Sequence, residues 1–374
     1  MKIAFLCGCL EFGCDGVGDY VRRLAGELAA QGHQTAGIAL NDEYVTQEVL
    51  AVEAGFTLLR LPAAWPSSRR VAHIKQWVAI FDPEWLSLQF VPFSFHPKGL
   101  PFGLGKQLEQ VGHGRMWHLM MHELWVGMQH EAPTKHVWWG KVQRYLIKAL
   151  IARLQPKVVH TQTRLYQAQL AKLRVESQLL PLFANIARAD SQAQAGPELP
   201  QALHTQAQAT IKLLMFGSIH PGAPVAAFVH DVAQYAAQAT PVVLTLVGRC
   251  GPEQAHWVAA WEGAGLPVEL LGEQTPQRIS EALASASLGI ATTPLAQIEK
   301  SGTTAAMLEH GLPVLCVARP WSPRGLGPLE VPAGIVAYVP GNFEAYLPAK
   351  ASMPAPATAH QIARQLASTL EVVA

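Results

Sequence analysis

The chain has 374 residues and a mass of 40.5 kDa, a length that favours two domains of roughly 150–200 residues each. Half of its residues are hydrophobic and only 15% are charged, which excludes a disordered chain and predicts a large buried core. Lysine and arginine number 28 and aspartate and glutamate 27, so the net charge of +1 argues against a dedicated nucleic-acid-binding protein.

The first residues are as hydrophobic as the start of a signal peptide, but the residues that follow them do not fit one. The apolar stretch Ile3–Leu6 is soon followed by Glu11, Asp15 and a glycine-rich loop, which indicates a buried strand. No apolar run approaches the roughly 18 residues that a membrane-spanning helix needs. We therefore expect a cytoplasmic protein.

The cysteines show neither disulfide nor zinc-site spacing. They are odd in number: Cys7, Cys9, Cys14, Cys250 and Cys316. This pattern favours small buried residues in a reducing compartment, and a redox or metal role of the first three is the alternative.

In the first half of the chain, short apolar runs alternate with helical patterns, which is typical of parallel strands that are covered on both faces. A helix is predicted from Val17 to Leu28, and Gly32 ends it. The predicted strands are Ile3–Cys7, Gln34–Leu40, Trp85–Phe90, Trp117–Met121 and Lys157–Thr161.

After Ile186 the periodicity stops. Residues 187–210 are rich in Gln, Ala, Pro and Ser and are predicted to form an interdomain linker or a long surface loop. The alternation then resumes, with predicted strands at Ile211–Phe216, Val242–Val247, Val268–Leu271, Leu288–Ala291 and Val314–Val317. The helices predicted after this point are Val225–Ala237, Gln277–Ala284, Ser301–His310 and a tail helix at Ala359–Leu370.

These patterns predict an α/β fold of two doubly wound, Rossmann-like domains. Residues 1–186 form the first and residues 211–356 the second, and residues 357–374 are expected to pack back on the first. Ligands of such sheets bind at the carboxyl ends of the strands, so two domains that face each other would enclose a substrate cleft.

A glycine-rich loop, residues 13–20, follows the first strand and opens the first helix. Gly16 and Gly18 let a backbone approach a phosphate closely, and the start of a helix offers free N–H groups. Val21 stands where a dinucleotide-binding motif has its third glycine, and only Asp42 or Glu43 can serve as its ribose carboxylate. A dinucleotide site and a tight turn without a ligand both remain as alternatives.

The most informative stretch runs from Glu299 to Pro313. Ser301 is a good N-cap, and Gly311 and Pro313 mark the end of the helix. The backbone amides at the start of this helix are predicted to hold an anion, and they belong to Gly302, Thr303 and Thr304.

Charged residues flank this helix start. Lys300 adds a positive charge beside the amides, and Glu299 is placed to accept hydrogen bonds from sugar hydroxyls. Glu309 lies in the last helical turn, where a carboxylate opposes the helix dipole. Such breaks of a local rule are typical of functional sites, although an exposed glutamate that tolerates the cost is the simpler alternative.

Taken together, these motifs resemble the GT-B glycosyltransferases, and most closely the large group of retaining enzymes often called family four. The stretch from Gly16 to Ala25 resembles the opening loop and helix of that group. Phe216–Ser218, Val247–Arg249 and Leu271–Gly272 fall where the group has its strand-end glycines. Glu299–Pro313 resembles its donor signature, a loop glutamate followed by a helix with a second glutamate.

The resemblance implies a metal-independent retaining transferase without a cofactor, which uses a nucleotide diphosphate sugar as donor and a hydroxyl acceptor. The acceptor can be a saccharide, a lipid-linked molecule or a small molecule. Glu299 and His122 are then the catalytic candidates, and Gly16 and Gly18 let the first domain close over the diphosphate. The further donor candidates are Ser218, Arg249, Lys300, Ser301, Gly302, Thr303, Thr304 and Glu309.

The sequence departs from the family pattern at two places. Glu299 and Glu309 stand ten residues apart, where the family signature spaces its glutamates eight apart. The loop from Ser218 to Gly222 carries neither of the basic residues that the family uses against the diphosphate, so Lys300 or Arg249 would have to replace them. A nucleotide-sugar epimerase of the same fold and a non-catalytic nucleotide-sugar-binding module therefore remain alternatives.

Two further regions provide candidates for the acceptor side. His122 ends a predicted strand and resembles the family histidine that touches the donor sugar, and the adjacent Glu123 can orient it or bind acceptor. The loop from Gln89 to Gly99 combines aromatic residues with His96 and Lys98. A simple packed loop is the alternative for both regions.

The segment from 132 to 175 has basic residues and no acidic ones. Lys141, Arg144 and Lys148 fall on one helical face, with Trp138 and Tyr145 nearby. Such a helix can lie on the inner, anionic face of a membrane, and a solvated basic surface is the commoner alternative.

Overall fold

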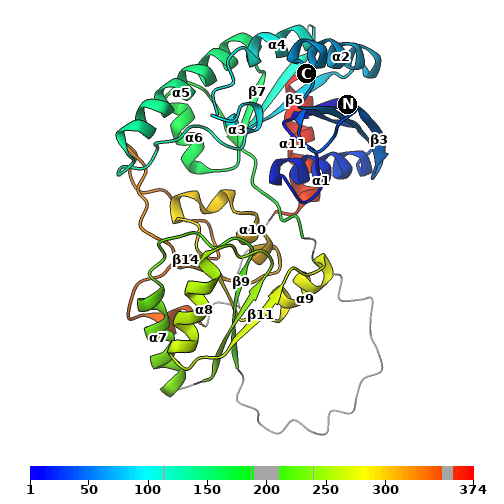
Figure 1. Cartoon of the computed structure of the whole chain (residues 1–374). Coiled ribbons are helices and arrows are strands. Elements are labelled where there is room, and N and C mark those ends of the chain that lie inside the picture. The colour runs from blue at the N-terminus through cyan, green and yellow to red at the C-terminus, as the bar shows by residue number, and fades with distance from the viewer. Residues whose placement is uncertain (113, 187, 189–209, 239, 348–356) are drawn as a thin grey trace, which may run out of the picture. The chain divides into compact units, whose positions relative to one another are not determined.

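The computed structural model describes residues 1–112, 114–186, 188, 210–238, 240–347 and 357–374. The chain forms two compact units (Figure 1). The first comprises Met1–Asn185, Ser322–Leu329 and Ala357–Ala374, and the second comprises Ile186–Trp321 and Glu330–Pro356. Both chain termini lie in the first unit.

The first unit is built on an eight-stranded sheet in the order β3-β4-β2-β1-β5-β6-β7-β8. All neighbouring strands are parallel except β3 and β4, which form an antiparallel hairpin. The strands are β1 Lys2–Cys7, β2 Gln34–Asp42, β3 Val49–Glu53, β4 Phe56–Pro62, β5 Trp85–Phe90, β6 Met116–Met121, β7 Val158–Thr161 and β8 Gln178–Leu179. Every residue of β5 and β7 is buried, as expected for central strands covered on both faces.

Helices cover both faces of this sheet. They are α1 Gly16–Ala30, α2 Ser67–Phe81, α3 Pro92–Phe95, α4 Leu104–Val111, α5 Thr134–Leu154, α6 Arg164–Ala171 and α11 Ala359–Val373. The tail helix α11 packs beside α1, and its apolar face joins the same hydrophobic core (Figure 1). Thr358 and Gln361 form a capping box that defines where α11 begins.

The second unit has a six-stranded, fully parallel sheet in the order β11-β10-β9-β12-β13-β14. Its strands are β9 Ile211–Phe216, β10 Val242–Val247, β11 Val268–Gly272, β12 Leu288–Ala291, β13 Val314–Cys316 and β14 Ile335–Ala337. Its helices are α7 Val225–Gln238, α8 Glu253–Gly263, α9 Pro276–Ser285, α10 Gly302–Glu309 and two short 3₁₀ helices, η1 Leu295–Lys300 and η2 Phe343–Tyr346.

The predicted class, two doubly wound α/β domains, is confirmed, and each predicted strand is present within two residues of its expected ends. The β3–β4 hairpin was not among the predicted elements. Residues 322–329, predicted to belong to the second domain, pack in the first unit. The predicted linker at 187–210 lies almost wholly outside the described residues.

The structure shows how exposed the cysteines are and whether any helix could span a membrane. Cys7, Cys250 and Cys316 are buried thiols, but Cys14 is exposed, contrary to the expectation of small buried residues. Cys14 is exposed because it lies in the glycine-rich loop ahead of α1 rather than in a strand. Within the described ranges, no helix is both long and apolar enough to cross a membrane.

The glycine-rich loop after β1 depends on close packing at Gly18. A Cβ at Gly18 would lie 2.8 Å from the backbone oxygen of Cys9 and 3.3 Å from the Cα of Leu10. At Gly16, two residues earlier, a Cβ would meet nothing within 4 Å. Gly18 therefore lets the first turn of α1 rest directly on the loop, whereas Gly16 faces open space.

We expect Gly18→Ala to lower the free energy of unfolding by about 1–3 kcal/mol, because the new methyl group would overlap rigid backbone. Gly16→Ala is the matched control and should be neutral or stabilising by up to about 1 kcal/mol, since alanine is the better helix former. Urea unfolding of both variants measures the difference. Equal stabilities would show that the loop does not constrain α1.

Candidate functional site

The loop between β1 and α1 is clamped to the end of β2 by a buried ion pair. Arg60 donates from Nε to Asp42 Oδ2 at 2.7 Å and from Nη2 to Asp42 Oδ1 at 3.1 Å, and it also pairs with Glu11. The amide of Leu10 donates to Asp42 as well. Burial alone would raise the pKa of Asp42, but the bonds from Arg60 and from two backbone amides lower it overall.

This clamp weighs against the dinucleotide alternative. The carboxylate of Asp42 is fully buried and occupied by protein donors, so it is not available to a ribose. Gly18, moreover, is explained by packing against Cys9 and Leu10 rather than by a phosphate. Asp15 caps α1 by accepting a hydrogen bond from the amide of Val17.

His122 lies directly after β6 and is buried against the start of α1. Its ring meets the ring of Tyr20 edge-on at 4.9 Å, and Tyr20 in turn stacks on Phe183. The amides of His122 and Glu123 both donate to the carbonyl of Phe90 at the end of β5. Burial lowers the pKa of His122 to about 4, so its imidazole is neutral at physiological pH.

A series of hydrogen bonds between buried polar side chains connects His122 to His160 below the edge of the sheet. Gln89 accepts from His122 Nε2 at 2.8 Å and donates to Ser87 Oγ at 2.7 Å. Ser87 Oγ lies 2.7 Å from His118 Nδ1, and His118 Nε2 lies 3.0 Å from His160 Nδ1. Burial lowers the pKa of His118 well below its usual range and that of His160 to about 4.

One arrangement of hydrogens gives each of these contacts a donor and an acceptor. In it, Ser87 accepts from Gln89 and donates to His118 Nδ1, and His118 donates from Nε2 to His160. At the other end, His122 donates from Nε2 to Gln89, and its ring is also hydrogen-bonded to Gln162.

The three acceptor-side candidates lie in two places. Glu123 follows His122 and acts electrostatically on Tyr166, whose pKa is raised first by burial and then by this carboxylate. His96 lies after α3, and its Nδ1 accepts from the amides of Lys98 and Leu100. Lys98 is exposed, and its carbonyl accepts from the indole of Trp139 on α5.

In the second unit, the glycines at the strand ends stack against one another. The amide of Gly217, after β9, donates to the carbonyl of Val247, and the amide of Gly248 donates to Gly272. Gly217 has a φ of 71°, and a Cβ there would lie 2.8 Å from Thr303 Cγ2. The loop that carries Ser218 therefore runs directly past the first turn of α10.

The start of α10 is capped as expected. Ser301 Oγ accepts from the amide of Thr304 at 3.2 Å and lies 3.0 Å from the hydroxyls of both Thr303 and Thr304. The expectation that the Thr304 amide is open to an anion is therefore wrong, because the cap itself occupies it. The amides of Gly302 and Thr303 have no protein partner among the described residues.

Three basic residues lie near one another at the carboxyl edge of this sheet. The pKa of His220 is lowered first by burial and then by the positive charges of Lys300 and Arg319, which places all three groups at one edge of the sheet. Arg319 also packs along Gly222, with its Cδ 3.3 Å from the position of a Cβ there. Arg249, which was expected to act here, has a side chain that is 74% exposed and lies 3.6 Å from Glu273.

The two glutamates of the donor signature occupy different ends of this region. Glu299 is half-buried in η1, next to Lys300 and the N-cap. Glu309 is the last residue of α10, about 10 Å along the helix from Gly302. In the described part of the chain, no three His, Cys, Asp or Glu side chains gather as a metal site would require.

No family model and no curated protein matches the sequence. The fold, however, is shared with solved structures. Anabaena Alr3699/HepE, in complex with UDP and glucose, superimposes with a TM-score of 0.60 at 14% identity over 100% of both chains. WaaG, a glycosyltransferase of lipopolysaccharide biosynthesis, gives 0.51 at 16% identity, with 86% of this chain and 87% of WaaG covered.

The chain has the GT-B glycosyltransferase fold.

The GT-B fold also includes epimerases. The UDP-GlcNAc 2-epimerase from Neisseria meningitidis, bound to UDP-GlcNAc, gives a TM-score of 0.54 at 9% identity over 100% of both chains. Glycosyltransferases are the more numerous structural neighbours. The fold is thus shared with both glycosyltransferases and a UDP-GlcNAc 2-epimerase.

Three residues of this GT-B chain escaped the sequence analysis. Arg319 follows β13, far in sequence from the loop it approaches, and only the order β9-β12-β13 brings it there. Gln89 and Tyr20 were each part of a stretch singled out for other reasons. Alternation in β5 places Ser87 and Gln89 on one face, and this was the only sequence signal for the polar chain.

We expect the buried histidines to make the protein less stable as the pH falls. A histidine in the unfolded chain has a pKa near 6.5, whereas the pKa values of buried His122 and His160 are about 4. Between these pH values the unfolded chain therefore binds more protons than the folded one. The free energy of unfolding should fall by about 1.4 kcal/mol per pH unit for each histidine in that range.

Urea unfolding at about pH 7 and pH 5 measures this dependence. His122→Gln should flatten it, whereas His256→Gln, which alters an exposed side chain, should leave it unchanged. A slope that is identical in all three proteins would contradict the neutral, buried state of His122.

Proposed function

We propose that this protein is a glycosyltransferase that moves a sugar from a nucleotide diphosphate sugar to a hydroxyl acceptor. The observation that carries the proposal is the pair of open amides of Gly302 and Thr303 next to Lys300, at the sheet edge where Arg319 and His220 also lie. A diphosphate leaving group needs such positive charge and N–H donors as its bond to the sugar breaks. The UDP bound by HepE supports a uridine nucleotide as the donor's base.

The residues suggest how the reaction would proceed. The amides of Gly302 and Thr303, with Lys300 and Arg319, would stabilise the departing diphosphate. Glu299 would accept hydrogen bonds from donor sugar hydroxyls, and His122 would contact the sugar. We propose retention by front-face attack: the acceptor oxygen bonds to the anomeric carbon as the sugar–phosphate bond breaks, and the acceptor proton passes to a phosphate oxygen.

One assay separates this proposal from its alternatives. The protein is incubated with a panel of nucleotide sugars, with and without hydroxyl acceptors, and the products are resolved by mass spectrometry and NMR. A transferase gives nucleoside diphosphate and glycosylated acceptor, with the anomeric configuration of the donor preserved. An epimerase alters the sugar without an acceptor, and a binding module binds without any turnover.

Lys300→Gln and Arg319→Gln should each weaken UDP binding by about tenfold or more. Each removes a charge-assisted hydrogen bond, and such bonds are typically worth about 1.5–3 kcal/mol. Arg278→Gln is the control, because this exposed arginine of the same unit pairs with Glu281 instead. Isothermal titration calorimetry provides the affinities, and unchanged binding in both variants would remove the cation cluster from the donor site.

We further propose that no metal ion takes part, and we expect turnover to survive EDTA. The reason is that, in the proposed donor site, side-chain cations and backbone amides would supply the positive charge that a metal ion otherwise provides. Donor turnover is measured before and after chelation. Activity that is lost with EDTA and restored by magnesium or manganese would contradict this expectation.

We also propose that α5 contacts an anionic membrane. Trp138, Val142 and Tyr145 are exposed at helical spacing on one face, and the ammonium of Lys141 lies 4.0 Å from the ring centroid of Trp138. Exposed aromatic residues among lysines are typical of helices that lie in a lipid headgroup region.

We expect the protein to co-sediment with vesicles that contain phosphatidylserine and not with neutral phosphatidylcholine vesicles. Lys141→Glu combined with Lys148→Glu should reduce this binding at least about tenfold, because each basic residue near the surface contributes roughly 1 kcal/mol. Lys75→Glu combined with Lys212→Glu changes the net charge by the same amount outside α5 and is the control. Equal loss in the control, or equal binding to neutral vesicles, would contradict the proposed contact.

A further inference from the structure

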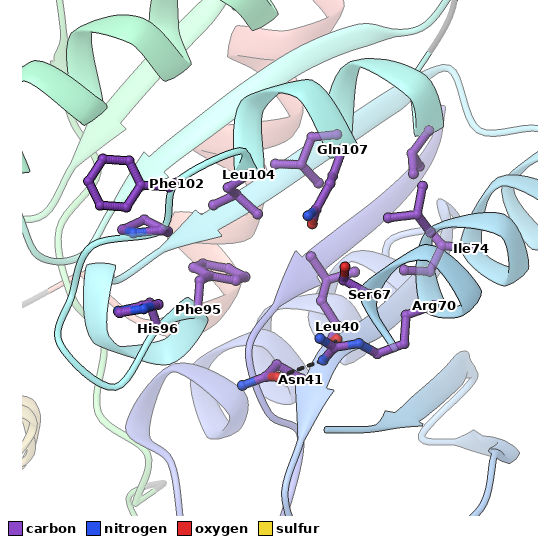
Figure 2. A pocket seen from close by; sticks show the side chains of 14 residues that line it. Leu40, Asn41, Ser67, Arg70, Ile74, Phe95, His96, Phe102, Leu104 and Gln107 are labelled. Carbon is purple, nitrogen blue, oxygen red and sulfur yellow. Dashed lines mark hydrogen bonds between the residues drawn. The ribbon is translucent and has the colours of Figure 1, made fainter. Parts of the chain in front are cut away.

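The first unit contains a pocket of about 150 Å³ at the carboxyl end of β2. Its walls come from the end of β2, from α2, from the segment after α3 and from α4 (Figure 2). Apolar and ring side chains form most of it, including Ile74, Phe95, Phe102 and Leu104. A cavity of this size accepts a single six-membered ring.

A cation without an acidic partner in the described part of the chain lies in the wall of this pocket. Arg70 donates from Nη1 to the carbonyl of Leu40 at 2.8 Å and to Asn41 Oδ1 at 2.6 Å (Figure 2). Its remaining N–H groups have no partner among the described residues, and none of the residues that line the pocket is acidic. Burial lowers the pKa of Arg70, and no neighbouring carboxylate offsets this.

Asn41 and His96 also leave donors rather than acceptors open, whereas Ser67 and Gln107 add a hydroxyl and an amide that can donate or accept. Asn41 Oδ1 is used by Arg70, and Asn41 Nδ2 is 3.4 Å from the carbonyl of Ser94. His96 Nδ1 accepts from two backbone amides, so the neutral ring carries its hydrogen on Nε2. Nε2 has no partner among the described residues, which adds a second open donor.

From these features we infer that the pocket binds a six-membered ring that carries a carboxylate or a phosphate. Arg70 and His96 are the donors to the anion, and Phe95 and Phe102 contact the ring. A guanidinium pairs more strongly with a carboxylate or phosphate than with a neutral hydroxyl. This inference rests on the proposed function: if the protein is a glycosyltransferase, the ring in this pocket belongs to the acceptor, which is then an acidic saccharide.

The test compares three probes on the wild-type chain at fixed ionic strength: glucuronate, glucose 6-phosphate and glucose. Ligand-observed NMR measures affinity, and the resonances of His96 report whether the probe enters the pocket. At least one anionic probe should bind about tenfold tighter than glucose and shift His96. Which anion binds better distinguishes a carboxylate from a phosphate.

Variants then locate the charge. Arg70→Gln should abolish the preference for the anion, Arg70→Lys should retain part of it, and Arg69→Gln should leave it intact. Arg69 is the matched control, because it is the adjacent arginine and stacks on Trp65 instead. Equal binding of glucose and both anions, or an equal effect of Arg69→Gln and Arg70→Gln, would overturn the inference. Should Arg70→Gln unfold, the three probes and Arg70→Lys still decide.

UDP binding measured on the same samples separates this inference from the proposed function. A protein that binds glucuronate in this pocket but no nucleotide sugar would overturn the transferase and leave the anion pocket standing. A protein that binds UDP but shows no preference for either anion would overturn the pocket alone.

Discussion

The burial of parallel strands on both faces decides where chemistry can occur in this protein. The central strands β5 and β7 are wholly buried, so neither face of the sheet is open to a ligand. The carboxyl edge is different, because the chain leaves each strand there in a loop that needs polar partners. His122 in the first unit and the Gly217–Ser218 turn in the second both lie at such an edge.

Because both faces of the sheet are buried, the polar side chains below its carboxyl edge must hydrogen-bond to one another. Asp42 can be ionised without water only because Arg60 and two backbone amides bind it. The chain from His122 through Gln89 and Ser87 to His118 follows the same logic with neutral groups. Each member satisfies the next, so the tautomer of one histidine is linked to that of another on the neighbouring strand.

The positive charges of the molecule are arranged in two distinct ways. Arg22, Arg60 and Arg153 are paired with carboxylates and serve the fold. Lys300 and Arg319 lie close enough to His220 to lower its pKa, and Arg70 is half-buried in a pocket that no acidic residue lines. A half-buried cation without a neighbouring anion raises the free energy of the ligand-free protein. An anionic ligand would relieve that cost.

The sequence by itself determined the strands, the class of fold and the capped start of α10. Each of these depends on residues close together in the chain: apolar runs, a serine before a helix, a glycine after it. The tertiary structure alone decided the rest. It showed that the cap occupies the amide of Thr304, that Gly18 serves packing, and that residues 322–329 belong to the first unit. It also brought Arg319 to the loop of His220 and left Arg249 exposed, because strand order, which no local pattern encodes, determines which loops become neighbours.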